Sequence, residues 1–349
     1  MNEIIGMDIT ELEGVMQLIG EPKYRAKQLF SWFHNKLIWD YNQMSNLSIG
    51  LRKKLVSSYE IAPIKMADKL VSSIDSTTKY LFELEDGNII ESVLMKYKHG
   101  NSVCISTQVG CRMGCKFCAS TIDGLVRNLT VAEMLAQVYS IALDTKERVS
   151  NVVLMGSGEP LERLDITTKF IKLINMEEGQ NIGTRHITVS TCGLVNSILE
   201  LAQLKLQITL AISLHAACDD RRKQIMPIAK KYNIAQVLDA CNVYTDITSR
   251  RVSFEYALIQ NNNDSLEDAH ALGRLLKGML CHVNLIPVNT VNESGFICTT
   301  DEGIRKFYEV LKSYNIETTV RRTLGQDIDA ACGQLRRRYL LEAKDRGEC

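Results

Sequence analysis

Over the last two thirds of the chain, short runs rich in β-branched residues alternate with longer segments that have helical spacing. Strand-sized runs separated by helix-sized segments are typical of parallel βα units, because a parallel connection needs a crossover long enough to hold a helix. Six or seven such units favour an open or partial βα barrel over a doubly wound sheet. The sequence therefore predicts an α/β fold with a partial (β/α)6-type barrel, its strands near 103–106, 152–155, 186–191, 209–215, 252–259, 282–288 and 317–322.

Two smaller units are expected before this barrel. Residues 1–60 have apolar and aromatic residues at helical spacing, which predicts a small N-terminal helical module. Both tryptophans, Trp32 and Trp39, lie there, and we interpret them as buried in an amphipathic module rather than as a base-stacking platform. The expected division is a helical accessory module at 1–60, a β-hairpin extension at 61–98, the core barrel at 99–340 and a C-terminal tail at 341–349.

Local sequence patterns define a hairpin and the start of a helix more precisely than the overall alternation does. Runs of alternating residues at 79–84 and 89–95 flank a turn that contains Gly87, which predicts a hairpin. Thr130 and Glu133 have the spacing of a capping box, in which each side chain bonds to the backbone of the other residue. A helix is therefore expected to begin just after Thr130.

Composition restricts the class of protein. The 349 residues are 45% hydrophobic and 23% charged with a formal net charge of zero, which excludes collagen-like, coiled-coil and disordered chains. No apolar run approaches the roughly 20 residues of a membrane span. Acids, among them Glu3, Asp8, Glu11 and Glu13, precede the first base, Lys23, unlike in a signal or transit peptide. We expect a soluble, cytoplasmic protein with no membrane partner.

Eleven cysteines are an informative number for such a chain. An odd count without an export signal argues against a disulfide framework and for reduced thiols, metal ligands or catalysts. Three of them, Cys111, Cys115 and Cys118, form a C-x3-C-x2-C loop after the first barrel strand. Those outside any motif are interpreted as core or surface thiols: Cys192, Cys218, Cys241, Cys281, Cys298 and Cys349.

Three thiolates are one short of the usual set for structural zinc or for a ferredoxin-type cluster. A 4Fe-4S cluster held by three cysteines has one iron free, and the amino and carboxylate groups of S-adenosylmethionine can chelate it. S-adenosylmethionine is a carrier of radical chemistry alongside iron–sulfur clusters. The alternative is a zinc site completed by a distant cysteine or histidine.

Polar residues gather where the predicted strands end. They lie at 156–160, 190–191 and 213–215, at Asn289, and in the cysteine loop. In a βα barrel the carboxyl ends of the strands open on one face, which is the catalytic one. The five segments are therefore expected to surround one site.

The cysteine spacing, with Phe117 before the last cysteine, resembles the radical SAM superfamily. The flanking segments resemble the RlmN/Cfr family of RNA adenine methyltransferases, over about residues 20 to 340. They are CISTQVGC at 104–111, LMGSGEPL at 154–161, SLHA at 213–216 and DIDAACGQL at 327–335. Pro160, Ala216 and the segment 287–289 are more similar to RlmN, which methylates carbon C2, than to Cfr, which methylates C8. The segment 324–326 lacks the Arg-Gly-Asp of many RlmN sequences.

The resemblance implies a radical SAM barrel with one 4Fe-4S cluster on Cys111, Cys115 and Cys118, and two S-adenosylmethionine molecules per turnover. It implies that Cys332 carries the methyl group as S-methylcysteine. Cys104 would help to deprotonate the adduct and then form a transient disulfide bond with Cys332. Glu91 matches the family's proton acceptor. The residues alone would place Glu91 in solvent, and whether it or Cys104 takes the proton stays open.

Small and polar residues at the strand ends suit a nucleoside cofactor. Gly158 and Glu159 are expected to approach the amino group of S-adenosylmethionine. Its carboxylate, ribose and adenine would be held by Ser190, Ser213, Leu214, His215 and Asn289.

The implied product is 2-methyladenosine, at adenosine 2503 of 23S rRNA before the ribosome is fully assembled and at adenosine 37 of tRNAs. A flavodoxin-type electron donor and a monomeric state are also implied. Two alternatives stay open: Cfr-like C8 methylation of the same rRNA adenosine, and a non-catalytic zinc-dependent RNA-binding module. The helical module and five basic clusters are candidate RNA contacts, at 221–223, 230–231, 250–251, 321–322 and 336–338.

Overall fold

A single ten-stranded sheet organises most of the chain. The computed structural model describes residues 2–61, 64–288 and 295–328. The strand order across the sheet is β14-β13-β12-β11-β10-β9-β6-β5-β4-β3. The strands are β3 (Lys65–Val71), β4 (Thr78–Glu83), β5 (Ile89–Tyr97), β6 (Gly100–Cys104), β9 (Val149–Leu154), β10 (Ile187–Thr191), β11 (Thr209–Ser213), β12 (Val252–Leu258), β13 (Cys281–Pro287) and β14 (Glu317–Val320).

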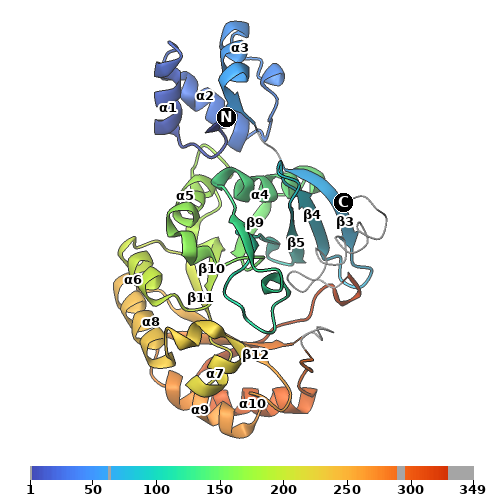
Figure 1. Cartoon of the computed structure of the whole chain (residues 1–349), viewed down its shortest axis with the longest axis vertical. Helices are drawn as coiled ribbons and strands as arrows, with labels where there is room; N and C mark the ends of the chain where they lie inside the picture. Colours follow the sequence, from blue (N-terminus) through green and yellow to red (C-terminus); the bar gives the residue numbers. More distant parts are fainter. Residues whose placement is uncertain (1, 62–63, 289–294, 329–349) are drawn as a thin grey trace.

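Seven strands, from β6 to β14, run parallel and lie side by side in chain order. Because consecutive crossovers of one hand in one direction leave their helices on the same face, the helices form an outer layer (Figure 1). They are α4 (Val131–Thr145), α5 (Leu164–Asn175), α6 (Val195–Gln203), α7 (Asp219–Ile225), α8 (Ile234–Thr248), α9 (Leu266–Leu276) and α10 (Asp301–Ser313). The prediction of a partial barrel with parallel βα units is confirmed, and its seven strand positions agree with the structure to within a few residues.

Side-chain caps define where several of these helices begin. The predicted capping box of α4 is present, because Thr130 accepts from the Glu133 amide and the Glu133 carboxylate accepts from the Thr130 amide. Asn233 and Gln236 form the same arrangement at the start of α8. Each cap satisfies amide groups that the first helical turn leaves without partners.

The sheet continues past β6 as an antiparallel extension of β5, β4 and β3. The predicted hairpin corresponds to β4 and β5, while β3 was not singled out by the sequence. Most side chains of β3 are exposed, and it forms the edge of the sheet. Exposed charges such as Lys65 and Lys69 are typical of an edge strand, and they hide the alternation by which a strand is recognised.

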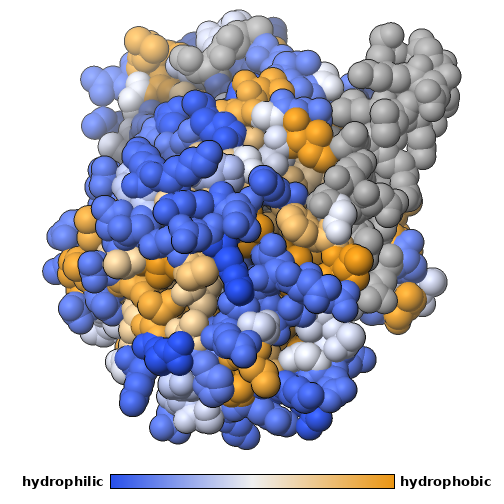
Figure 2. All heavy atoms as spheres, turned by 60° about the horizontal axis from the view of Figure 1, so that its bottom comes forward, coloured by the Kyte–Doolittle hydropathy of each residue, from blue (hydrophilic) through white to orange (hydrophobic). Residues whose placement is uncertain are grey.

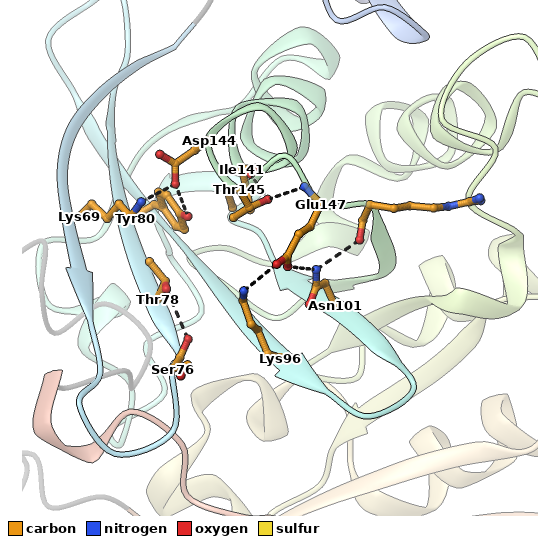
Figure 3. A network of polar contacts seen from close by, with 11 residues as sticks. Lys69, Ser76, Thr78, Tyr80, Lys96, Asn101, Ile141, Asp144, Thr145 and Glu147 are labelled. Atoms are coloured by element: carbon orange, nitrogen blue, oxygen red, sulfur yellow. Dashed lines mark hydrogen bonds and ion pairs between the residues drawn. The ribbon is translucent and has the colours of Figure 1, made fainter.

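Polar contacts fasten this extension to the end of α4. The Asp144 carboxylate accepts from Lys69 Nζ at 2.5 Å and from the Tyr80 hydroxyl at 2.7 Å (Figure 3). Glu147, just beyond the helix, pairs with Lys96 Nζ at 3.0 Å. The extension is therefore held against the helical layer as well as by its own ladder of strands.

The N-terminal module is built from α1 (Ile9–Leu18), α2 (Arg25–His34), α3 (Ile49–Ser58) and a short parallel pair, β1 (Asn2–Glu3) with β2 (Tyr59–Glu60). Trp32 is only 6% exposed, and its Nε1 donates to Asn46 Oδ1 at 2.5 Å. Trp39 is half-buried and packs near Tyr139 of α4. The interpretation of these rings as part of a packed core is confirmed.

A buried histidine joins this module to the barrel. His34 Nδ1 lies 2.8 Å from the Tyr139 hydroxyl, and both side chains are fully buried. Burial lowers the pKa of His34 to about 3, so the ring is neutral at physiological pH. At the periphery Lys169 pairs with Glu11 at 2.6 Å. The module therefore packs against α4 and α5, beyond which it projects in Figure 1.

None of the described helices is long and apolar enough to cross a membrane. The face that Figure 2 brings forward is largely hydrophilic, with its hydrophobic residues in separate patches.

His34 makes stability depend on pH. The folded pKa lies below the ordinary value of 6.5, so the unfolded chain binds a proton that the folded chain does not, and stability falls as pH drops through about 6.5. We expect the slope of unfolding free energy against pH to be smaller in His34→Gln, by up to about 1.4 kcal/mol per pH unit. Urea denaturation between about pH 5 and pH 7 measures it.

Tyr139→Phe is the matched control. It keeps the ring buried but removes the hydroxyl, so it should cost about 1–3 kcal/mol at all pH values while keeping most of the slope. Equal slopes in wild type and His34→Gln would contradict the prediction.

Candidate active site

A cavity of about 340 Å³ lies at the carboxyl ends of the parallel strands. Its wall comes from the segments after β9, β10, β11 and β13, from the cysteine loop, and from residues 321–324 beyond β14. Val93 and Met95 of β5 also line it, so the antiparallel extension supplies one side. The predicted convergence of strand ends on one site is present, except that Asn289 lies outside the described residues.

Main-chain contacts hold the cysteine loop in shape. The loop runs between β7 (Gln108–Gly110) and β8 (Leu125–Asn128), which pair antiparallel. Gly110 has φ +73°, and a Cβ there would lie 1.9 Å from the Gly124 carbonyl oxygen. The Cys111 amide donates to that same carbonyl at 2.9 Å. Only glycine at position 110 allows the two backbone segments to come this close, and their contact fixes the position of Cys111.

The thiols of Cys111, Cys115 and Cys118 all line the cavity. Burial raises the pKa of Cys111 to about 12 and raises that of Cys115 further. Burial thus disfavours the thiolate form, and a bound metal would favour it, because thiolates are the form that binds metals. No three His, Cys, Asp or Glu side chains among the described residues are arranged to hold a single metal ion. Three thiols around one cavity fit a cluster better, because each would bind a different iron.

Gly158 and Glu159 both line the cavity. Both also lie close to other residues in or next to the cavity wall. Gly158 has φ +111°, and a Cβ there would lie 2.6 Å from Thr107 Oγ1. The Glu159 carboxylate is buried and accepts from the amides of Leu161 at 3.0 Å and Cys192 at 2.7 Å. Burial raises the pKa of Glu159 despite these hydrogen bonds. The carboxylate thus joins the ends of β9 and β10.

Of the residues expected to hold the cofactor at the ends of β10 and β11, three line the cavity and one does not. Ser190 and Ser213 are half-buried and line the cavity. His215 also lines it, with Nδ1 accepting from the Ala257 amide at 2.9 Å; burial lowers its pKa to about 3, so it is neutral. Leu214 is fully buried and is not part of the wall.

Cys104 and Glu91 are both buried, at 7% and 6% exposure. Cys104 is opposite Val93 across the β5–β6 pair, and Glu91 lies two residues before Val93 on β5. Residues two apart on a strand, and residues opposite each other, point to the same face of a sheet, and Val93 lines the cavity. Both side chains are therefore on the cavity side of the sheet. The solvent-exposed position that the residues alone suggested for Glu91 is wrong.

Cys332 lies outside the described residues. The chain that leads to it is fastened to the turn after β3: the Gly325 amide donates to Asp75 at 2.8 Å and the Ser73 amide donates to Asp327 at 2.8 Å. Arg321 and the three residues after it line the cavity. The described part of the chain thus ends near the site, four residues before Cys332.

None of the nine described cysteines forms a disulfide bond with another described residue. A disulfide bond between Cys104 and Cys332 stays a prediction, since Cys332 is not described. Of the cysteines outside any motif, Cys241 is buried in the core and Cys218 is exposed, as expected. Cys192 is also buried, but it lies in the cavity wall and packs near Cys115.

Sequence reasoning missed Glu255, a buried carboxylate in the middle of β12 that lines the cavity. Its two oxygens accept from Ser253 Oγ at 3.0 Å and from Asn284 Nδ2 at 2.8 Å. Burial raises its pKa, although Arg321 acts in the opposite direction. The available signal was an acid inside an otherwise apolar strand.

The basic segment 221–223 is not a surface cluster throughout. Arg222 is fully buried, whereas Lys223 is exposed. The interpretation of this cluster as an RNA-binding surface is therefore wrong for Arg222.

Comparisons with known proteins agree with this geometry. A model of the radical SAM superfamily matches residues 105–272, and a model of the ribosomal RNA large subunit methyltransferase N-terminal domain matches residues 2–61. A probable dual-specificity RNA methyltransferase RlmN of Clostridium novyi (strain NT) is 54% identical over 340 residues, covering 97% of this chain and 99% of that one. The chain belongs to the RlmN family.

Other RlmN-family members are equally similar. A probable dual-specificity RNA methyltransferase RlmN of Alkaliphilus oremlandii (strain OhILAs) is 56% identical over 338 residues, covering 97% of this chain and 98% of that one. The crystal structure of a radical SAM methyltransferase from Sphaerobacter thermophilus has a TM-score of 0.92 at 42% identity, covering 96% of this chain and 99% of that one. Fold and family are thus supported over nearly the whole length.

Gly158 provides a test of the cavity wall. Gly158→Ala should reduce the free energy of unfolding by about 2–5 kcal/mol, because a positive φ and the close contact with Thr107 both oppose a Cβ. Gly87→Ala is the control, since φ there is +76° and a Cβ would meet nothing within 4 Å. It should cost only about 1–2 kcal/mol. Chemical denaturation compares the two variants, and equal losses would contradict the steric argument.

Proposed function

We propose that this chain is a radical SAM RNA methyltransferase that forms 2-methyladenosine at adenosine 2503 of 23S rRNA and adenosine 37 of tRNAs. The observation that carries the proposal is the cavity at the strand ends, which is lined by three cysteines, with Cys104 and Glu91 on the cavity side of the ten-stranded sheet. Membership of the RlmN family supports it. The C8 methylation typical of Cfr is an outcome of the test below.

The residues fit a 4Fe-4S cluster on Cys111, Cys115 and Cys118, with S-adenosylmethionine beside it. When bound, these groups supply the methyl group and the one-electron chemistry that an electron-poor ring carbon requires. The ends of β9, β10 and β11 would hold the cofactor, through Gly158, Ser190, Ser213, His215 and their neighbours. Glu159 would act by fixing that wall, and Leu214 by packing behind it.

The chain's own residues would take the covalent steps. Cys332 would carry the methyl group as S-methylcysteine. Each turnover would consume two S-adenosylmethionine molecules. Dividing one difficult step into feasible ones is the advantage of covalent catalysis. Glu91 or Cys104 would remove the proton from the ring carbon. The Cys104 thiolate would then attack the Cys332 sulfur, so that the bond between this sulfur and the transferred carbon breaks as the disulfide bond forms. The electron pair of the broken bond, with a proton, would stay on that carbon and complete the methyl group of the released product. The buried positions of Glu91 and Cys104 support this assignment, because water is kept from them.

RNA would approach the open side of the cavity. Arg321 and Arg322 line the cavity, where they would meet phosphates beside the unstacked adenosine. Lys230 and Lys231 are exposed and stay candidates for further contacts. We also propose that the module at 1–60 is the accessory RNA-binding unit, joined by the extension at 61–98 to a barrel that ends near 340.

The absence of a disulfide bond among the described cysteines is consistent with the reducing setting of the cytoplasm, where we propose that the enzyme works. We further propose a monomer that receives electrons from a flavodoxin-type donor, as the family resemblance implies. The RNA substrate would be 23S rRNA before full ribosome assembly, and tRNA. A zinc-dependent binding module is less consistent with the site, because the described thiols are not arranged around a single ion.

Nucleoside mass spectrometry tests the product. Reconstituted protein is incubated without oxygen with a 23S rRNA fragment or tRNA, S-adenosylmethionine and reductant. We expect 2-methyladenosine from wild type and from the control Cys218→Ala, whose side chain is exposed and does not line the cavity. Cys332→Ala should form none. A peak of 8-methyladenosine would move the chain to Cfr-type chemistry, and unmodified RNA from protein that cleaves S-adenosylmethionine would refute the proposed substrate.

Cluster content provides a separate test. Cys118→Ala should lose most of the iron and labile sulfide, because the cluster would lose one of its three thiolates, whereas Cys218→Ala should retain them. Colorimetric iron and sulfide analysis of anaerobically purified protein measures both. Zinc in place of iron, held equally by wild type and control, would favour the binding-module alternative.

A further inference from the structure

Arg222 of α7 has the largest fully buried side chain of the described residues, with 0% exposure. Its guanidinium donates to the carbonyl of Cys192 at 2.7 Å, of Leu214 at 3.2 Å, and of Ser213 and Tyr232 at 3.3 Å. Three of these carbonyls lie at the ends of β10 and β11, directly behind the cavity wall. Arg222 therefore holds two strand ends together from the inside.

The charge of Arg222 is not matched by a contacting acid. All four hydrogen bonds go to carbonyl groups, and no described carboxylate forms an ion pair with it. Burying a cation without a counter-charge is strongly unfavourable. The groups that interact electrostatically with Arg222 are first the thiols of Cys192 and Cys115 and then the half-buried carboxylate of Asp219, which forms no ion pair with it. Cys115 is one of the three proposed cluster ligands.

The helix that carries Arg222 packs directly on the cysteine loop. The Lys116 amide donates to the Ile225 carbonyl, the last residue of α7, at 2.9 Å. Met226, just after α7, packs in the same cluster of buried residues as Cys115 and Cys192. A Cβ at Gly114 would lie 3.3 Å from Pro227. These contacts place the buried cation beneath the loop that would carry the cluster.

We propose that Arg222 is the buried counter-cation of the cluster, and that its charge raises the reduction potential of the cluster while its hydrogen bonds position the ends of β10 and β11. Three thiolates give such a cluster a net negative charge, which grows when it accepts an electron. A fixed positive charge nearby stabilises the reduced state more than the oxidised one, and net charge and burial are among the factors that set these potentials. Arg222 is thus a positioning residue. The inference rests on the proposed cluster but not on the RNA substrate.

The test is a redox titration of the cluster, followed by electron paramagnetic resonance, in the full-length holoenzyme. Arg222→Gln removes the charge and should shift the midpoint potential to a lower value than in wild type. Arg222→Lys keeps the charge and should restore the potential to near wild type. Lys223→Gln is the control on the same helix, because this side chain is 44% exposed and should leave the potential unchanged.

An unchanged potential in cluster-loaded Arg222→Gln would overturn the proposal, because a purely structural role would change stability or cluster content but not potential. If Arg222→Gln holds no cluster, the cluster content and potential of Arg222→Lys decide between a role for the charge and a purely structural role. A retained cluster at the wild-type potential supports a role for the charge. Loss of the cluster in that variant as well shows that only the carbonyl contacts matter, and overturns the role of the charge. Wild type without iron or sulfide would instead refute the proposed function.

Discussion

The sequential order of the parallel strands is the constraint on which the rest of the molecule depends. Each crossover returns the chain to the next position in the sheet, so α4 to α10 cover one face, and the other face curves around an interior. Since every parallel strand points the same way, the segments that follow β9, β10, β11 and β13 meet at one end. The antiparallel strands β5, β4 and β3 extend the sheet beyond β6, and β5 supplies another side of the cavity.

The interior near these strand ends contains charged and polar groups that a protein core ordinarily excludes. Glu159 is buried between two amides, Glu255 between Ser253 and Asn284, and Arg222 among four carbonyls. Each group forms at least one hydrogen bond to a neighbouring strand or to the segment that follows one, which connects the wall of the cavity laterally. The buried polar groups thus give the site a defined shape before any cofactor binds.

The N-terminal module and the extension are fastened to the barrel by different means. His34 and Tyr139 meet in a buried contact, whereas Asp144 binds Lys69 and Tyr80 nearer the surface. The strength of a buried contact between neutral groups does not depend on salt, because solvent does not reach it. Exposed ion pairs are screened by salt, and each contributes little to stability. The module is therefore held mainly by its packed face, and the extension mainly by its strand ladder.

The sequence by itself determined the alternation of strands and helices, the capping box of α4, the hairpin of β4 and β5, and the loop of three cysteines. These features depend on residues close together in the chain, where periodicity and spacing act directly. Only the tertiary structure decided that Glu91 is buried, that Arg222 leaves its basic cluster for the core, and that Glu255 faces the cavity. Whether a side chain is buried, and which groups it contacts, depends on segments that are far apart in the sequence. The sequence around a charged residue therefore does not distinguish a residue exposed to water from one buried beneath the cysteine loop.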